Sequence, residues 1–214
     1  MAQDSDQIPD EIACLNTRDM LATLISTVGF NCEVWQCAGI IVSEGLRTSI
    51  DFVIKRHRFE CDQYKRRVYQ RDYRRLRDAL AELIPRALFV ATRINKEDNM
   101  IVLAQAHRPW FDLAHEGNED EARPLLRHSP KARAQLARFV GAARQWANEG
   151  RVIDLYGREN LILDRDRNVR YLDSFGVFFY ADMASAVAGV DEEYQERVDI
   201  SERRLDYVES LLSG

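Results

Sequence analysis

Residues 151–176 read RVIDLYGRENLILDRDRNVRYLDSFG, and the fold that we expect depends on them. Two short apolar runs, LILD and VRYL, stand on either side of a charged turn that ends in Asn, which is typical of a β-hairpin. Because the strands of a hairpin run antiparallel, the residues just outside them, Asn160 and Asp173, meet at the same end. Asp154 precedes them in a loop. An amide oxygen and carboxylates held together in this way predict a site for a hard divalent cation.

These residues resemble the protein-kinase-like superfamily, and they lie nearer its aminoglycoside-kinase branch than the true Ser/Thr protein kinases. Asp154, Leu155 and Asn160 are similar to the family's catalytic loop, in which an Asp base precedes a metal-binding Asn. Asp173-Ser174-Phe175-Gly176 is similar to the Asp-Phe-Gly motif that follows, with one Ser inserted. The resemblance implies that Asp154 is the catalytic base and that Asn160 and Asp173 bind Mg²⁺.

The sequence departs from the family pattern in the catalytic loop and in the phosphate-binding region. Five residues separate Asp154 from Asn160, one more than in the family motif, so we expect the chain to bulge at Tyr156-Gly157. Gly157 is the residue that can adopt the unusual backbone angles such a bulge requires. Tyr156 stands where protein kinases have Lys. A phosphate-covering Gly-rich loop, G-x-G-x-x-G, is absent from the sequence.

An upstream strand and the helix after it carry further residues whose roles the resemblance implies. Val53-Ile54-Lys55 resembles the end of the family's V-A-I-K strand, where Lys55 would hold the α- and β-phosphates of ATP and Val53 would contact the nucleotide. In the next helix Asp72 falls on or beside the apolar stripe, so its carboxylate needs a partner. That partner is either Lys55, as the family's Lys–Glu pair implies, or Arg75 in an ion pair at the helix surface.

The order of the expected elements is that of a kinase-like β-rich lobe followed by a helical lobe. We expect strands over 33–43, 48–57, 87–94 and 100–106, helices over 17–29, 61–83, 129–150 and 191–212, and an acidic loop at 116–121. Gln105, Ala106 and His107 then stand at the hinge, where backbone groups would meet adenine. We therefore predict an α+β, two-lobed protein-kinase-like fold, with a small antiparallel β-sheet lobe over 1–106 and a mostly helical lobe over 107–214.

Helical periodicity predicts which side chains of the last helix face the core. An apolar residue recurs on one side of this helix every three or four positions. The residues expected to point inward are Val198, Ile200, Leu205, Val208 and Leu211 or Leu212.

The composition indicates a folded protein without a membrane segment. Of the 214 residues 46% are hydrophobic and 30% charged, and no apolar run approaches membrane-spanning length. Residues 1–10 are acidic and contain no apolar core of a signal peptide, so we expect a cytoplasmic protein. Four cysteines without a CxxC pair indicate reduced thiols in or near the core rather than a zinc site or disulfides.

Positive charge is concentrated in one stretch, although the net charge of the chain is −5. From Lys55 to Arg77 there are ten Lys or Arg residues and three Asp or Glu. Two functions stay open. The first is phosphotransfer from ATP, with Mg²⁺, to a hydroxyl of a small molecule or protein. The second is a non-catalytic, pseudokinase-like module that docks an acidic protein or nucleic acid through its basic helix. A solvated helix face also accounts for the charges.

Overall fold

The structure, a computed structural model, describes residues 22–26, 32–43, 45–180 and 192–213. The chain divides into two compact units, which we describe separately. Unit 1 comprises the residues up to Arg71 together with Pro85–Ala106, and unit 2 comprises Asp72–Ile84 together with the chain from His107 onward.

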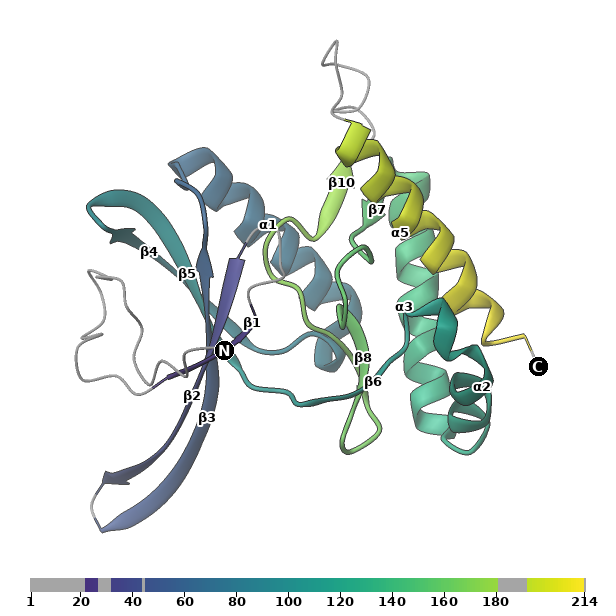
Figure 1. Cartoon of the computed structure of the whole chain (residues 1–214), viewed down its shortest axis with the longest axis horizontal. Coiled ribbons are helices and arrows are strands. Elements are labelled where there is room, and N and C mark those ends of the chain that lie inside the picture. The colour runs from purple at the N-terminus through teal and green to yellow at the C-terminus, as the bar shows by residue number, and fades with distance from the viewer. Residues whose placement is uncertain (1–21, 27–31, 44, 181–191, 214) are drawn as a thin grey trace, which may run out of the picture. The chain divides into compact units, whose positions relative to one another are not determined.

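Unit 1 contains an antiparallel sheet of five strands in the order β1-β2-β3-β5-β4 (Figure 1). The strands are β1 (Thr23–Ser26), β2 (Cys32–Ser43), β3 (Leu46–His57), β4 (Ala87–Ile94) and β5 (Glu97–Gln105). All four strands predicted for this part of the chain are confirmed. β5 begins earlier than predicted because Asn95 and Lys96 alone make the turn, with φ angles of 50° and 73°. Positive φ at both central residues is what a two-residue hairpin turn requires.

Strand β1 corrects one of the predictions. The apolar spacing of residues 17–29 predicted a helix, but Thr23–Ser26 pair antiparallel with β2, with Leu24 opposite Trp35. The β-branched side chains of Thr23 and Ile25 suit a strand, and the free edge of β2 offers them a ladder of hydrogen bonds. The rest of the predicted helix lies outside the described residues.

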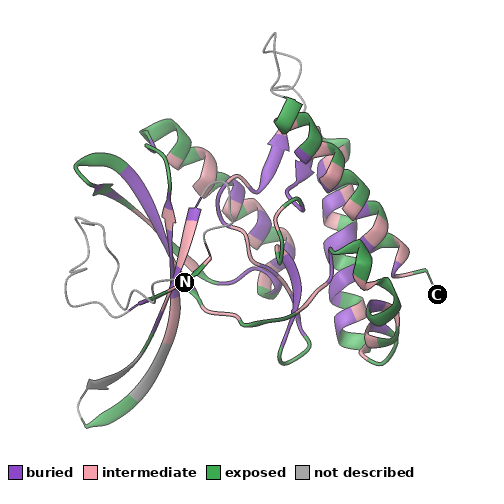
Figure 2. Cartoon of the chain, in the orientation of Figure 1, coloured by how far each residue is buried: buried purple, intermediate pink, exposed green. Residues whose placement is uncertain are grey.

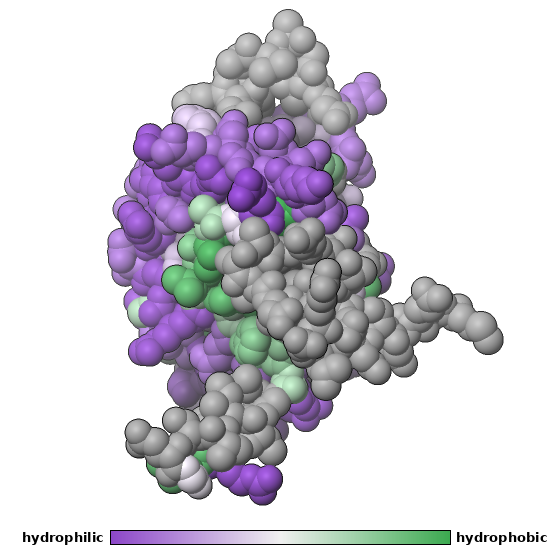
Figure 3. Space-filling model, turned by 90° about the vertical axis from the view of Figure 1, so that its left-hand side faces the viewer, coloured by the Kyte–Doolittle hydropathy of each residue, from purple (hydrophilic) through white to green (hydrophobic). Residues whose placement is uncertain are grey.

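The two faces of the five-stranded sheet carry different kinds of side chain, because successive residues of a strand point to opposite faces. One face carries a buried apolar cluster, against which further partly buried residues pack. Figure 3 shows a patch of hydrophobic residues on the surface of the chain next to hydrophilic ones. The other face carries Lys55 and His57, and His57 Nε2 lies 3.1 Å from the hydroxyl of Tyr69 on helix α1 (Gln63–Leu80). The members of the buried cluster are Ala22, Trp35, Cys37, Ile54, Ile94 and Ile101.

Unit 2 is mostly helical, with two small sheets. Its helices are the second part of α1, the short 3₁₀ turns Ala81–Leu83 and Glu116–Asn118, α2 (Glu119–Arg127), α3 (Pro130–Asn148) and α5 (Glu192–Ser210). Its strands are β6 (Pro109–Asp112), β7 (Arg151–Ile153), β8 (Leu161–Asp164), β9 (Val169–Tyr171) and β10 (Phe178–Tyr180). They form the sheets β6-β8-β9 and β10-β7. Every residue of β8 is buried, and so are the inner faces of α3 and α5 (Figure 2).

Helix α3 leads the chain into the candidate site. It begins as predicted, because Ser129 Oγ accepts a hydrogen bond from the Ala132 N–H at 3.4 Å and Pro130 is the first helical residue. The helix ends at Asn148, and the φ of 76° at Gly150 then turns the chain into β7. Helical spacing predicts a buried stripe of five residues, Leu136, Phe139, Val140, Ala143 and Ala147. The first four are buried in the core of unit 2, whereas Ala147 is half-buried.

Helix α2 corrects a second prediction, the acidic loop at 116–121. Glu119, Asp120 and Glu121 form the first turn of this helix. Negative side chains stabilise a helix at that end, because they interact favourably with the exposed N–H groups and the helix dipole. Ala122 and Leu126, buried in the core of unit 2, supply the apolar contacts that hold the helix in place.

The α+β class predicted from the sequence is confirmed, with a small antiparallel sheet in one unit and mostly helices in the other. The chain passes between the units at three points, after Arg71 within α1, after Ile84 and after Ala106. Cys32, Cys37 and Cys61 are buried, as expected, and Cys14 lies outside the described residues. Among the described helices, none has the length and apolar character needed to cross a membrane.

Candidate active site

The β8–β9 hairpin brings Asn160 and Asp173 to the same end, as the sequence predicted. Leu161 lies opposite Tyr171 in the register of the two strands. One step further along, the N–H of Leu172 donates to the backbone oxygen of Asn160 at 2.8 Å. Asp173 follows Leu172 directly, so backbone pairing determines where the amide and the carboxylate lie.

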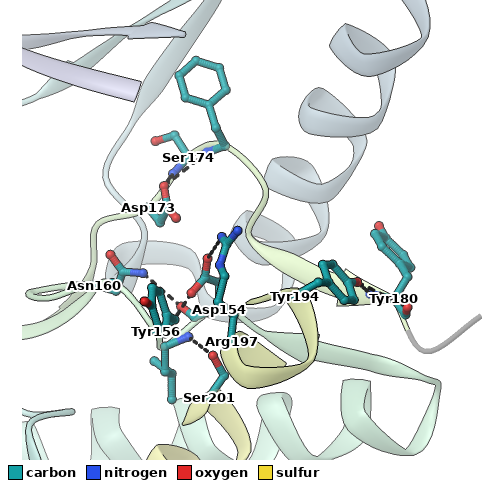
Figure 4. Close-up of polar contacts among 12 residues, drawn as sticks. Asp154, Tyr156, Asn160, Asp173, Ser174, Tyr180, Tyr194, Arg197 and Ser201 are labelled. Atoms are coloured by element: carbon teal, nitrogen blue, oxygen red, sulfur yellow. Dashed lines mark hydrogen bonds and ion pairs between the residues drawn. The ribbon is translucent and has the colours of Figure 1, made fainter. Parts of the chain in front are cut away.

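Asp154 lies beside this end of the hairpin because its backbone is held there by three hydrogen bonds (Figure 4). Its N–H donates to Val177 O at 2.9 Å. Its carbonyl oxygen accepts from Asn160 Nδ2 at 3.1 Å and from the Tyr171 hydroxyl at 3.0 Å. Residues from β7, the hairpin and the segment before β10 therefore converge on one position.

The Asp154 carboxylate is almost fully buried, with 4% of the residue exposed. Its Oδ1 accepts a hydrogen bond from the Tyr156 N–H at 2.8 Å, and its Oδ2 lies 3.7 Å from a guanidinium nitrogen of Arg197 on α5. Burial, and then the negative charge of Asp173, raise the pKa of Asp154 to about 7, against the lowering effect of Arg197. A carboxylate with a pKa near neutral can accept a proton from a reacting hydroxyl at physiological pH.

Asp173 and Asn160 form a donor set that fits a hard cation. Asp173 Oδ1 accepts hydrogen bonds from the N–H groups of Ser174 at 2.6 Å and Phe175 at 3.3 Å, which orients the carboxylate. The amide nitrogen of Asn160 points to Asp154 O, so its Oδ1 is turned the other way. Carboxylate and amide oxygens are the ligands that Mg²⁺ prefers in proteins, so these residues could hold it.

The role expected of Gly157 was wrong. Its φ is not among the positive ones, and the left-handed residue of the loop is Glu159, with φ 58°. The Glu159 N–H donates to Asp112 Oδ2 at 3.0 Å, which stabilises this turn. Gly157 is required for a different reason, since a Cβ there would lie 2.8 Å from both Nδ2 and Oδ1 of Asn160. The loop accommodates its additional residue at Glu159, and Gly157 leaves room for the Asn160 amide.

Lys55, predicted to bind the phosphates, and Val53, predicted to contact the nucleotide, are both buried. Lys55 and Val53, on β3 in unit 1, are 8% and 9% exposed. Asp72 is 2% exposed and accepts a hydrogen bond from the Tyr180 hydroxyl at 2.6 Å within unit 2. The carboxylate of Asp72 thus faces inward as expected, and the ion pair with Arg75 stays an alternative. The Lys55–Asp72 pair stays a prediction, since the two residues belong to separately described units.

The predicted hinge residues are held by contacts within their own units. The N–H groups of Gln105 and Ala106 donate to Arg86 O and Asp51 O, each at 3.2 Å. In unit 2, His107 Nδ1 lies 3.9 Å from Asp164 Oδ2. Burial, together with the charge of Arg170, lowers the pKa of His107. Binding of adenine by these residues stays a prediction.

The sequence analysis did not identify three residues of α5 that contact the loop from Asp154 to Gly157, which we call the catalytic-like loop. These residues are Arg197, Ser201 and Arg204. Arg197 and Ser201 are buried, whereas Val198 and Ile200, predicted to point inward, are half-buried. The sequence did contain a signal for two of them. Leu205 was correctly predicted to be buried, and steps of four residues back along the same helix face lead from it to Ser201 and then to Arg197. Polar side chains at those positions had hidden it.

The chain was compared with family models, curated protein sequences and solved structures. No family model matches the chain, and no curated protein sequence matches it. Among solved structures the chain is similar to the kinase PK-1 of Cydia pomonella granulovirus, with 14% sequence identity and a TM-score of 0.45. The match covers 76% of this chain and 54% of that one, so the chain spans about half the length of the viral kinase.

We predict that Asp154→Asn raises the stability of the protein more at pH 8 than at pH 4. The pKa of Asp154 is about 7 in the folded protein and lies near 3.8 when the carboxyl is exposed, so ionisation opposes folding as pH rises between these values. The neutral amide does not ionise. Thermal unfolding across this pH range should show a difference from wild type that grows by roughly 1 kcal/mol or more.

Gly141→Ala, which changes no titratable group, is the control, and its difference from wild type should stay flat with pH. A flat difference for Asp154→Asn as well would contradict a raised Asp154 pKa.

We also predict that Gly157→Ala displaces the Asn160 amide and weakens Mg²⁺ binding at least tenfold, measured by titration calorimetry. The new methyl would lie 2.8 Å from both polar atoms of Asn160, closer than they can tolerate. Gly141→Ala is the matched control, because a Cβ there meets nothing within 4 Å and Gly141 lies within α3. It should leave binding unchanged and stabilise the protein by about 0.5–1 kcal/mol. Equal Mg²⁺ affinity in the two variants would show that Asn160 is not a ligand.

Proposed function

We propose that the protein is an ATP- and Mg²⁺-dependent phosphotransferase that acts on a hydroxyl group. The observation that carries this proposal is the Asp154 carboxylate, buried beside Asn160 and Asp173 with its pKa raised to about 7. A general base works best when its pKa lies near the working pH. The resemblance of the sequence to the kinase-like superfamily assigns the same three residues to a base and two metal ligands.

In this proposal Asp154 accepts the proton of the attacking hydroxyl. One carboxylate oxygen is held by the Tyr156 N–H and the other lies near Arg197, so the group cannot rotate freely. Orientation matters because proton transfer requires the acceptor hydroxyl within hydrogen-bond distance of the base. Burial at 4% exposure keeps bulk water away from the carboxylate.

Asn160 and Asp173 would hold Mg²⁺, which supplies positive charge against the phosphates of the nucleotide. The N–H groups of Ser174 and Phe175 fix one oxygen of Asp173 and so hold the ligand in place. Lys55, oriented by Asp72, is assigned to the phosphates by the sequence resemblance alone. Val53 and the hinge residues Gln105, Ala106 and His107 are assigned to the nucleotide on the same basis.

The acceptor is a hydroxyl of a small molecule or a protein, and the likeness to the aminoglycoside-kinase branch favours a small molecule. Incubation with labelled ATP and a metabolite extract would identify it, because the product retains the transferred phosphate.

A second candidate function is a binding module that docks nucleic acid or an acidic protein. The observation that favours it is the basic exposed surface of α1, where Tyr64, Lys65, Arg67 and Arg71 are all exposed. Arginine and tyrosine contact phosphates and bases readily. Binding of a fluorescent oligonucleotide, measured against salt concentration, separates the two functions, because counterion release makes such binding strongly salt-dependent.

We predict that Mg²⁺ and ATP together raise the melting temperature of the protein, and that Asp173→Ala abolishes the rise whereas Asp154→Ala does not. A ligand that binds the folded state stabilises it by about 2.7 kcal/mol at a hundredfold excess over its Kd, so the rise should grow with ATP concentration. Differential scanning fluorimetry measures it. No shift of the wild type at millimolar ATP and Mg²⁺ would contradict the proposal.

We further predict that Asp154→Asn reduces ATP turnover by on the order of a hundredfold, as expected for the loss of a positioned base. The amide preserves the shape of the side chain, so the affinity for Mg²⁺ and ATP should change little. Steady-state ATP consumption in the presence of the identified acceptor measures both quantities. Equal turnover by the variant and the wild type would show that Asp154 is not the base.

A further inference from the structure

Helix α5 contacts the catalytic-like loop through three residues on one face, Arg197, Ser201 and Arg204. Their spacings of four and three residues place them along the same side of the helix. Arg197 and Ser201 are buried, although neither is apolar. Polar residues on the buried face of a helix require partners, and the loop from Asp154 to Gly157 supplies them.

Ser201 and Arg204 bind the backbone of this loop. The Leu155 N–H donates to Ser201 Oγ at 3.1 Å (Figure 4). A guanidinium nitrogen of Arg204 donates to Leu155 O at 2.6 Å, Tyr156 O at 2.7 Å and Gly157 O at 3.4 Å. These bonds hold the peptide groups that directly follow Asp154.

Arg197 contacts the carboxylate itself. One of its guanidinium nitrogens lies 3.7 Å from Asp154 Oδ2, at ion-pair distance. The guanidinium carbon lies 5.5 Å from the centre of the Tyr156 ring and 5.2 Å from that of Phe179. Both rings lie within the range of a cation–π interaction, so Arg197 is fixed by two aromatic side chains from different elements.

The two oxygens of Asp154 are therefore held by different parts of the chain. Tyr156 N–H, within the loop, binds Oδ1, whereas Arg197, on α5, lies near Oδ2. A buried guanidinium is costly unless it is paired, so the Arg197 charge and the Asp154 charge stabilise each other. Without Arg197 the carboxylate would keep one fixed oxygen and the repulsion of Asp173.

We propose that Arg197 is a positioning residue for Asp154, through which helix α5 orients the carboxylate for proton transfer. The inference rests on the proposed phosphotransfer for its catalytic consequence, but the orientation can be measured without turnover. Tyr156 stands in the loop where the related kinases have a cation, and here the cation comes from α5 and stacks on that Tyr.

The test compares Arg197→Met and Arg197→Lys with Arg203→Met. Arg203 lies on the same helix but is exposed and pairs with Glu116, so its loss controls for a general effect on α5. We expect Arg197→Met to lower the kcat of ATP turnover at least tenfold with KM for ATP changed less than threefold. Arg197→Lys should recover part of kcat, and Arg203→Met should stay within twofold of wild type. A kcat of Arg197→Met within twofold of wild type, or a parallel loss of Mg²⁺–ADP binding, would overturn the proposal.

Amide hydrogen exchange provides a readout that does not depend on activity. The Tyr156 N–H, bonded to Asp154 Oδ1, should exchange at least tenfold faster in Arg197→Met and at the wild-type rate in Arg203→Met. If the wild type consumes no ATP, the proposed function fails, yet faster exchange in Arg197→Met alone would still support positioning. Unchanged exchange would overturn the positioning role whether or not the protein is active.

Phe179→Leu is the alternative test variant if Arg197→Met does not fold. It removes one of the two rings that fix Arg197 and leaves the charge in place. We expect kcat to fall about threefold and the Tyr156 amide to exchange faster. Wild-type values for both quantities in a folded Phe179→Leu would overturn the proposal.

Discussion

Burying a carboxylate costs free energy unless hydrogen bonds or opposite charges surround it. In unit 2 the elements around Asp154 provide such partners for its carboxylate. Its charge, together with that of Asp173, is unfavourable away from water. The Tyr156 N–H and the Arg197 guanidinium offset part of that cost. What remains uncompensated raises the pKa of Asp154 to about 7, which is the range that the proposed role as a base requires.

Backbone hydrogen bonds place the site, and side chains then determine its chemistry. The pairing of Leu172 with Asn160 fixes the end of the hairpin, and the Tyr171 hydroxyl ties that hairpin to Asp154 O. Tyr171 is fully buried, and burial next to two carboxylates raises its pKa well above the ordinary value, so its hydroxyl keeps the proton that it donates. The loop therefore has little freedom at Asp154.

Helix α5 shows how an element far along the chain can belong to a site. The first half of this helix makes polar contacts to the loop that follows Asp154. In its second half, Leu205 and Val208 pack in the core of unit 2. The core fixes the helix, and the fixed helix positions Ser201 and Arg204 against the loop backbone. The stability of the site and that of the C-terminal helix are consequently coupled.

The sequence by itself determined most of the local structure. Four strands of the sheet in unit 1, the capped helix α3 and the β8–β9 hairpin follow from short-range patterns, because turn residues, caps and alternation act within a few positions. Hairpin geometry is also local, which is why the meeting of Asn160 and Asp173 was predictable. The prediction of an acidic loop at 116–121 was wrong, because a few acidic residues are as typical of a helix start as they are of a loop.

Only the tertiary structure decided what depends on contacts between distant residues. β1 is a strand because it pairs with β2, although its apolar spacing also suits a helix. The space left by Gly157 is filled by Asn160, and the left-handed angle at Glu159 is supported by Asp112. Arg197 reaches Asp154 across more than forty positions of sequence, which no local pattern encodes. Periodicity gives the direction of a side chain, but the charge that it meets there is set by how the elements pack.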